Sequence, residues 1–589
     1  MIPRSDPNND FAEDIYKSPE IPVQPAQRPT HHTIDDRAIL TWQYPINYPK
    51  RDYQYNIIRR ALFTNTLVSL PTGLGKTFIA AVVMLNYFRW FPKSKIVFMA
   101  PTRPLVNQQI EACFNICGIP QDATVELTGQ SNPALRQQVW KDKRVFFCTP
   151  QILNNDLKSG LCPAKDLVCL VVDEAHRATG NYAYSQVVRE LEPINRDVRI
   201  LALSATPGSD IRAVQKVVTN LKIAKIESRT EDSMDLQAYV FKRNITEIVV
   251  PCGRDISEIR DKFARMMRPH LERLMKSGVI RTADPAQLSR FAILQGKNGY
   301  VQDNRGNSST KNIMVRTSLI CMSLVAAYEL LVVYGIWPFF NKNNQDDDED
   351  DEIKVSLARK AMEENPDFMR MMDQIRVKVK QPTFVSHPKI ERLVAIVIKH
   401  FMDHQDKIDA SRGSSSTAGA GSRATPAQTR VMIFANFRES VDEISRVLEK
   451  HQPLIKVRRF IGQATAKGKK GISQKEQQKV VADFQKGEYN VLVATSIGEE
   501  GLDIGDVDLI VCYDSHSSPI RMLQRMGRTG RKRAGKICLL LAEGQEEGKY
   551  RKSQSTYKAV QKAITQGNQI VYYPENPKII PAGPLPTCD

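Results

Sequence analysis

Short runs of consecutive apolar residues alternate with helix-like segments from about residue 50 to 228. The runs "LVSL", "KIVFMA", "RVFFCT", "LVCLVVDE" and "RILALSAT" have no polar face, which is typical of strands buried on both sides in a parallel sheet. The alternation returns over residues 384–560 with "RVMIFAN", "NVLVATS", "VDLIVCYD" and "GKICLLLAE". The pattern therefore predicts an α/β protein with two parallel-sheet domains.

Between these two regions the pattern is mainly helical. Segments such as "ISEIRDKFARMMRPHLERLMK" have helical periodicity, and strand signals are few. The apolar stretch 318–340 is long enough to cross a membrane, but it contains Glu329 and lacks a second span, so we interpret it as a buried helix. We therefore expect a disordered segment 1–38, a first domain 39–228, a helical insertion domain 229–383, a second domain 384–560 with a flexible loop at 411–428, and an extended tail 561–589.

Charge adds a partner class to this picture. The chain has 589 residues and a net charge of +18, which favours a polyanionic partner such as nucleic acid. The pairs Cys113/Cys117 and His400/His404 have no second pair nearby, so we expect no structural zinc. The polar, acidic N-terminus is unlike a signal peptide, and the ten scattered cysteines fit a reducing compartment, so we expect no membrane partner.

The segment "LVSLPTGLGKTFIAAVVML" places a glycine-containing loop, residues 72–77, between an apolar strand and a helix. Backbone N–H groups of such a loop point inward, and the helix N-terminus behind it adds partial positive charge. Lys76 can reach the β- and γ-phosphates of a nucleotide, and the Thr77 hydroxyl can ligate Mg²⁺. The loop therefore predicts a nucleotide site.

Charged residues at two other places fit phosphate chemistry. The strand in "LVCLVVDEAHRATG" delivers Asp173 and Glu174 to the carboxyl edge of the sheet, where Asp173 can hold Mg²⁺ and Glu174 can orient or deprotonate the attacking water. In "MLQRMGRTGRKRAGK", Arg528 and Arg531 would share one face of a helix and could act on the γ-phosphate as arginine fingers. A plain basic surface helix is the alternative for the second segment.

The segments "PTGLGKT", "APTRPLVNQQ", "VVDEAH", "LSATP", "TSIGEEGLDI" and "QRMGRTGR" occur in this order and resemble the motif series of superfamily 2 helicases. The resemblance spans nearly the whole chain after the first 38 residues. "VDEAHRATGNYAY" and "ATSIGEEGLDIGDVDLIVCYD" are similar to the Fanconi anaemia group M (FANCM) and archaeal Hef family, and "RDYQYNIIRRALFTNTLVSLPTGLGKT" is close to its fungal branch. The resemblance implies two RecA-like domains that close on ATP and Mg²⁺, with a helical insertion between them.

The same resemblance implies roles for individual residues. Gln54 would read adenine, and the other nucleotide contacts would be Thr72, Gly73, Gly75, Lys76, Thr77, Gly501 and Asp503. The catalytic residues would be Lys76, Asp173, Glu174, Gln524, Arg528 and Arg531. Coupling of the ATP state to domain closure would fall to His176, Ser204 and Thr206. Phosphate contacts with a polynucleotide would come from Thr102, Arg103, Thr128, Gly129, Thr149, Gln151, Asn436, Arg438 and Thr495.

The resulting functional hypothesis is an ATP-dependent 3′–5′ DNA helicase or translocase, in the nucleus, that acts on forks, displacement loops and Holliday junctions in DNA repair and recombination. The resemblance also implies a histone-fold heterodimer partner that binds sequence after the motor. Archaeal relatives carry a nuclease domain, and no comparable segment follows residue 560, so we expect no nuclease activity. The alternatives are a double-stranded RNA translocase like RIG-I or Dicer, and a non-catalytic ATP-gated scaffold.

The insertion supplies a hypothesis of its own. Its helix "RDKFARMMRPHLERLMK" has an apolar side formed by Phe263, Met267, Leu271 and Leu274, while Lys262, Arg265 and Arg273 lie largely elsewhere. A core stripe with a solvated basic face accounts for the pattern of this helix alone. The functional interpretation is that the basic face grips a duplex arm of branched DNA, with Lys467, Lys469 and Lys470 as a second candidate phosphate contact.

Overall fold

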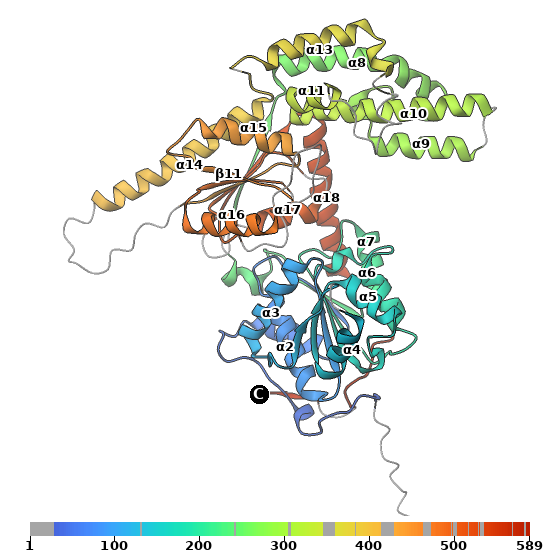
Figure 1. Cartoon of the computed structure of the whole chain (residues 1–589), viewed down its shortest axis with the longest axis vertical. Helices are drawn as coiled ribbons and strands as arrows, with labels where there is room; N and C mark the ends of the chain where they lie inside the picture. Colours follow the sequence, from blue (N-terminus) through green and yellow to red (C-terminus); the bar gives the residue numbers. More distant parts are fainter. Residues whose placement is uncertain are drawn as a thin grey trace, which may run out of the picture.

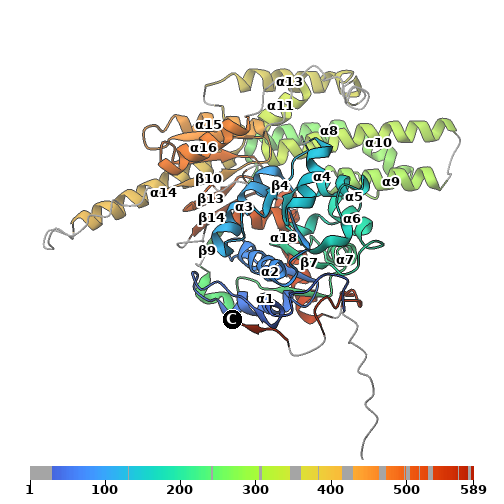
Figure 2. The ribbon, with the colours of Figure 1, turned by 60° about the horizontal axis from the view of Figure 1, so that its bottom comes forward.

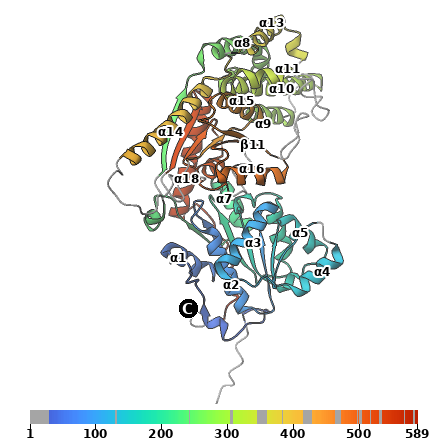
Figure 3. The same ribbon diagram turned by 60° about the vertical axis from the view of Figure 1, so that its left-hand side comes forward.

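The computed structural model describes residues 29–129, 132–240, 243–303, 308–344, 358, 360–382, 384–413, 429–462, 473–495, 498, 504–515, 518–527, 529, 535–567, 569–581 and 585–589. Two α/β domains and a helical insertion are seen, as the apolar pattern predicts (Figure 1). The second domain lies between the first domain and the insertion in Figures 1 and 3. The expected fold class is confirmed.

The first domain is built on a seven-stranded parallel sheet with strand order β4-β5-β3-β6-β7-β2-β8. Its strands are β2 (Thr66–Ser69), β3 (Lys95–Met99), β4 (Thr124–Glu126), β5 (Val145–Cys148), β6 (Leu167–Val172), β7 (Arg199–Ser204) and β8 (Lys225–Ser228). Its helices are α1 (Asp52–Ala61), α2 (Lys76–Trp90), α3 (Arg103–Cys117), α4 (Pro133–Asp142), α5 (Pro150–Lys158), α6 (Ala183–Leu191) and α7 (Ile211–Asn220). All six residues of β6 are buried, because helices cover both faces of the sheet.

The second domain has a six-stranded parallel sheet with order β11-β12-β10-β13-β14-β9. Its strands are β9 (Arg243–Val250), β10 (Val431–Phe434), β11 (Val457–Phe460), β12 (Val491–Ala494), β13 (Leu509–Cys512) and β14 (Gly535–Ala542). Its helices are α14 (Pro388–Gly413), α15 (Arg438–Glu449), α16 (Gln474–Lys486), α17 (Pro519–Met526) and α18 (Gln545–Gln566). Most of the loop expected at 411–428 lies outside the described residues.

Strand β9 corrects the expected start of the insertion. Residues 229–383 were expected to be mainly helical, yet β9 pairs with β14 in parallel over eight residue pairs and forms the edge of the second sheet. Its sequence "RNITEIVV" is mostly solvent-exposed, as an edge strand permits, and only Val250 is buried. A strand without a continuous apolar run gives no clear signal in the sequence, so it was missed.

The insertion is a helical body that packs against the second domain. Its helices are α8 (Gly253–Lys276), α9 (Arg290–Gln302), α10 (Ser308–Glu329), α11 (Ile336–Asn344) and α13 (Pro366–Val379), with a π-helical turn η6 (Leu330–Tyr334) after α10. The apolar side of α8 is buried as expected, at Phe263, Met267, Leu271 and Leu274.

By length and composition, the segment Ser308–Tyr334 could cross a membrane. However, 61% of its most apolar 18-residue window is buried inside the protein. There it contributes to the core of the insertion domain, together with α8 and α13. This agrees with the interpretation of a buried helix.

Both ends of the described chain pack on the first domain. Of the segment 1–38, expected to be disordered, residues 29–38 are described, and Thr30, His31 and His32 hydrogen-bond to Asp197. The tail expected to be extended begins within α18, which starts on the second domain and ends against the first.

Beyond α18, Ile579 is buried in the first domain's core, and β15 (Thr587–Cys588) pairs with β1 (Thr41–Trp42). The C-terminus therefore lies beside the first domain, near α1 (Figure 2).

Candidate nucleotide and nucleic-acid site

The glycine loop has the backbone of an anion cradle. Gly73 and Gly75 have φ values of 84° and 80°, which residues with a Cβ rarely adopt, and α2 begins directly after them at Lys76. A Cβ at position 75 would lie 2.2 Å from Nε2 of Gln54. Gln54 is itself buried on α1, and its amide donates to the carbonyl oxygen of Leu74 at 3.2 Å. The amide expected to read adenine therefore lies against the loop expected to hold the phosphates.

The two polar side chains after the loop are held by local partners. The Lys76 ammonium donates to the backbone oxygen of Leu70 at 2.9 Å, so it lies over the loop. The Thr77 hydroxyl donates to Oε1 of Gln109, a buried residue of α3, at 2.9 Å. A hydroxyl that gives its proton to an amide oxygen keeps its lone pairs for a cation.

The acidic pair follows β6 at the carboxyl edge of the sheet. Glu174 has a φ of 48°, a left-handed conformation that is costly for a residue with a side chain and is found mainly at functional sites. Asp173 Oδ1 accepts from the Glu174 N–H at 2.9 Å. The His176 ring nitrogen Nδ1 lies 3.3 Å from a Glu174 carboxylate oxygen and 3.1 Å from the Ser204 hydroxyl.

Burial disfavours the ionised form of both Asp173 and Glu174. Burial and the adjacent Glu174 carboxylate raise the pKa of Asp173 to about 7, against the charge of Lys76. Burial also opposes ionisation of Glu174, but His176 and the charge of Lys76 outweigh it and lower the Glu174 pKa. The charge of Lys76 thus favours the ionised form of both carboxylates. Two buried carboxylates on adjacent residues repel each other, and a bound divalent cation relieves this repulsion. Carboxylate oxygens are also ligands that suit Mg²⁺.

Among the described residues, no group of three or more His, Cys, Asp or Glu side chains is placed to hold a metal ion. The groups that would hold Mg²⁺ are Asp173 and the Thr77 hydroxyl. This matches the way Mg²⁺ is bound beside phosphates, with one or two carboxylates and the remaining positions filled by phosphate and water. The residues present fit the ion.

The expected coupling residues lie at the end of the neighbouring strand β7. Ser204 and Thr206 are both fully buried, and the Ser204 hydroxyl donates to the Thr206 backbone oxygen. His176 contacts both Glu174 and Ser204, so one ring bridges the acidic pair and the next strand. The three residues are thus brought together at the ends of two adjacent strands, and their coupling role stays a prediction.

The second domain meets the glycine loop through α17. A Cβ at Gly527, directly after α17, would lie 1.8 Å from the Thr72 hydroxyl, so glycine is needed for this close approach. Gln524 on α17 is 3% exposed, and within the described part of the chain both polar atoms of its amide lack a hydrogen-bond partner. A buried amide in this state is costly unless a ligand satisfies it. Gly501, Asp503, Arg528 and Arg531 lie outside the described residues.

The candidate residues of the first domain divide one sheet edge into two halves. Apart from Gln54 on α1, the nucleotide and coupling candidates follow β2, β6 and β7, which are consecutive neighbours in the sheet. The nucleic-acid candidates Thr102, Arg103, Thr128, Gly129, Thr149 and Gln151 follow β3, β4 and β5, which form the other contiguous group. Side chains from adjacent parallel strands lie close together at their carboxyl ends. Each set therefore gathers into its own region, and the two regions adjoin where β3 meets β6.

The loop residues expected to contact nucleic acid are mostly accessible. Thr102, Arg103, Gly129 and Gln151 are exposed, and Thr102 and Thr149 stand at the N-caps of α3 and α5. Helix N-termini offer backbone N–H groups to phosphate oxygens. Arg103 is paired with Glu126 at 3.1 Å.

In the second domain the expected contacts Asn436, Arg438 and Thr495 follow the adjacent strands β10 and β12. The half-buried Asn436 also contacts other protein groups through its amide, and its contact with nucleic acid stays a prediction. Its Oδ1 accepts from Arg525 at 2.6 Å, and its Nδ2 donates to the Tyr334 hydroxyl at 3.3 Å. The candidates Lys467, Lys469 and Lys470 lie outside the described residues.

Four residues of this region carried no role in the sequence interpretation. Gln109 holds Thr77, and its segment "APTRPLVNQQ" was recognised only as a motif. Arg51 lies over the ring of Tyr239 at 5.1 Å beside the glycine loop, and Arg525 is a fully buried residue of α17. Arg51 directly precedes the segment "DYQ" that contains Gln54, so its position in the sequence was the available signal. The sequence around Tyr239 and Arg525 does not indicate the contacts that these two residues make.

Comparison with known proteins places this geometry in a family context. Residues 51–214 match the family model "DEAD/DEAH box helicase", and residues 424–533 match "Helicase conserved C-terminal domain". The crystal structure of the Pyrococcus furiosus Hef helicase domain superposes with a TM-score of 0.60 at 31% sequence identity. The match covers 85% of this chain and 98% of that one.

Curated relatives are similar along nearly the full chain. The ATP-dependent DNA helicase mph1 of Sclerotinia sclerotiorum is 46% identical over 570 residues, which cover 95% of this chain and 45% of the relative. The protein of the same name from Aspergillus fumigatus is 44% identical over 582 residues, covering 98% of this chain and 52% of the relative. The chain thus spans about half the length of the curated relatives it matches.

Proposed function

Because this chain belongs to the FANCM/Hef family of superfamily 2 DNA helicases, we propose that it is an ATP-driven motor that moves along DNA. The observation that supports this most directly is the divided sheet edge, where a nucleotide cradle adjoins a row of loops suited to phosphate oxygens. In this proposal, closure around the nucleotide moves the adjoining loops that hold the polynucleotide. A non-catalytic scaffold would not need the buried Asp173/Glu174 pair.

The proposed chemistry assigns each group a step. The glycine loop and Lys76 hold the phosphates of ATP. Asp173 and the Thr77 hydroxyl would hold Mg²⁺, which when bound would supply positive charge to the phosphate oxygens. Glu174 orients and deprotonates the attacking water, and it is available for this because His176 and Lys76 offset its burial and keep the carboxylate ionised. Gln524, Arg528 and Arg531 of the second domain complete the site when the two domains close.

DNA is the proposed polynucleotide, because the relatives with this architecture bear the name ATP-dependent DNA helicase. Contacts to phosphate rather than to bases let a motor pass any sequence. Movement in the 3′–5′ direction, action on forks, displacement loops and Holliday junctions, a role in repair and recombination in the nucleus, and a histone-fold heterodimer as partner are parts of the same proposal. They rest on the family alone.

The test is steady-state ATP turnover of the purified protein with no effector, single-stranded DNA, forked DNA, a Holliday junction or double-stranded RNA. We expect branched DNA to stimulate turnover at least about tenfold, as binding energy is used to close the cleft. A Lys76→Ala preparation run in parallel shows whether the turnover belongs to this site. Stimulation by double-stranded RNA alone would identify an RNA translocase, and ATP binding without turnover would identify a scaffold.

The insertion is proposed to grip a duplex arm of the branched DNA. Arg265 and Arg273 are exposed on α8, while the opposite side of this helix is buried in the core, so both guanidinium groups can reach a phosphate backbone. A groove beside Arg265 is completed by α13, whose Arg370 adds a further cation to it.

Reversal of both charges, Arg265→Glu with Arg273→Glu, should weaken fork binding about tenfold and reduce its salt dependence, because about two phosphate contacts are lost. Binding is measured by fluorescence anisotropy at several salt concentrations. The matched control is Arg212→Glu with Lys216→Glu, the same charge change on exposed residues of α7 in the first domain. Equal fork affinity of the α8 variant and the control would refute the grip.

A further inference from the structure

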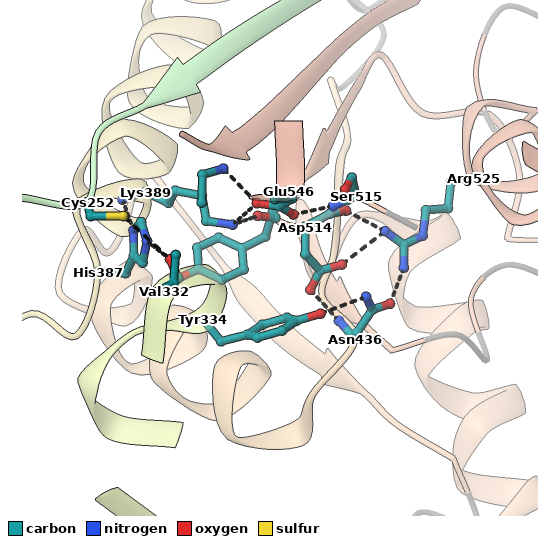
Figure 4. Close-up of polar contacts among 12 residues, drawn as sticks. Cys252, Val332, Tyr334, His387, Lys389, Asn436, Asp514, Ser515, Arg525 and Glu546 are labelled. Carbon is teal, nitrogen blue, oxygen red and sulfur yellow. Dashed lines mark hydrogen bonds and ion pairs between the residues drawn. The ribbon is translucent and has the colours of Figure 1, made fainter. Parts of the chain in front are cut away.

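The insertion contacts the second domain through a buried polar cluster that lies next to α17 (Figure 4). The contact on the insertion side is Tyr334, the last residue of the π-turn η6. Its ring packs edge-on against Phe437 with the centroids 4.5 Å apart, and its hydroxyl accepts from Nδ2 of Asn436 at 3.3 Å. Because η6 continues α10, the C-terminal end of the long apolar helix of the insertion contacts the second domain through this hydroxyl.

Asn436 connects Tyr334 to α17. Its Oδ1 accepts from the guanidinium of Arg525 at 2.6 Å, and its backbone N–H donates to Asp514 at 2.7 Å. Arg525 also donates to the backbone oxygen of Asp514 at 2.9 Å and lies 3.2 Å from its carboxylate. Arg525 and Asp514 are both fully buried, so neither can exchange its partner for water.

The turn that presents Tyr334 is fixed in place. Gly335 has a φ of 103°, and a Cβ there would lie 2.5 Å from the Ser386 backbone oxygen. The N–H groups of Ile336 and Trp337 both donate to Ser386, at 3.1 Å and 2.8 Å. His387 lies 3.1 Å from the Val332 backbone oxygen and also belongs to this junction. The turn is therefore rigidly joined to the segment that leads into α14.

In the sequence, Arg525 lies between Gln524 and Gly527, which both belong to the candidate ATP site. It directly follows Gln524 on α17, and Gly527 two positions later contacts Thr72 of the glycine loop. Asn436 thus connects the Tyr334 hydroxyl to the guanidinium of Arg525 on α17. The covalent and hydrogen-bonded path from the insertion to the glycine loop is short, and it is fully buried at Arg525.

We propose that Tyr334, Asn436 and Arg525 form a positioning relay, through which DNA bound at the insertion sets the position of α17 and thereby the rate of ATP turnover. The proposal rests on the proposed function, because it concerns the stimulation of turnover by DNA. Tyr334 is a positioning residue in this scheme. It touches neither ATP nor the polynucleotide, and it acts through Asn436 and Arg525.

The test is Tyr334→Phe, which removes one oxygen atom and keeps the ring that packs on Phe437. The matched control is Tyr328→Phe, the same change in α10, where the ring is buried in the insertion core. For each protein, turnover is measured without DNA and across a titration of forked DNA, and fork affinity and the thermal unfolding midpoint are recorded. This separates the maximal stimulated rate from the DNA concentration that gives half of it.

We expect Tyr334→Phe to lower the maximal fork-stimulated rate about fivefold, the effect of one buried hydrogen bond. Basal turnover, fork affinity and the unfolding midpoint should match those of the Tyr328→Phe protein. Equal loss of basal and stimulated turnover, a loss shared by Tyr328→Phe, or full stimulation of Tyr334→Phe would each overturn the relay. A wild-type protein that no DNA stimulates would overturn the proposed function and the relay together.

Discussion

Replacement of Glu174 by glutamine is expected to lower ATP turnover about a thousandfold while ATP still binds, which is the range found when a general base is removed. The amide has nearly the shape of the carboxylate but cannot accept a proton. His176, 3.3 Å away, and the charge of Lys76 lower the pKa of Glu174 in spite of burial, so the carboxylate is ionised and has no proton of its own. Turnover is measured at saturating ATP and forked DNA, and binding by titration with a fluorescent nucleotide.

The matched control is Glu190→Gln, the same exchange at an exposed position on α6 of the same domain. It should keep wild-type turnover. Loss of nucleotide binding in parallel with turnover in the Glu174 variant would show that the residue holds the site together rather than activating water. Turnover within tenfold of wild type would remove Glu174 from the role of base.

Replacement of Arg199 by alanine is expected to reduce the free energy of unfolding of the first domain by about 3 kcal/mol, more than a hundredfold in the folding equilibrium. Arg199 is 1% exposed and donates to Tyr87, to Asn65 and to the tail residues Asn576 and Pro577, all at 2.9–3.0 Å. Its loss removes a donor from all four acceptors and also creates a cavity, although Asn65 Oδ1 and Asn576 Oδ1 each keep a backbone N–H donor, from Ile200 and Asn65.

Denaturant unfolding of the variant measures the stability, and limited proteolysis measures the release of the tail. Cleavage near residues 570–577 should become much faster, because two of the four contacts of Arg199 hold this segment. Arg196→Ala is the control, since this arginine lies three residues earlier and is exposed. Unchanged protection of the tail in the Arg199 variant would show that other contacts anchor it.

The central strands and the nucleotide loop could be predicted from the sequence. Strand β6 is buried on both faces, so all six of its residues are apolar, and a short run of this kind is typical of a central parallel strand. The loop at residues 72–77 is equally local, because the positive φ angles of Gly73 and Gly75 must be encoded by glycines at those positions. The position of Asp173 and Glu174 could be predicted as well, because the end of the preceding strand places them at the sheet edge.

The edge strand β9 and the tail could not be predicted in this way. An edge strand with solvent on most of its side chains has no apolar run, and its pairing with β14 joins residues about 290 positions apart in the chain. The tail is held by Arg199 through Asn576, a contact across 377 positions between residues whose types are common at surfaces. Neither pairing leaves a periodic signal in the sequence.

The sequence by itself therefore determined the elements whose burial or backbone conformation is local, namely the two parallel sheets, the glycine loop and the acidic pair. Tertiary structure alone decided which polar side chains meet. The sequence indicated Asn436 only as a candidate nucleic-acid contact, and the fold shows that it joins Tyr334 of the insertion to Arg525 of α17. The physical reason is that a buried hydrogen bond depends on the partner brought to it by the fold, whereas an apolar strand or a left-handed glycine carries its requirement within its own few residues.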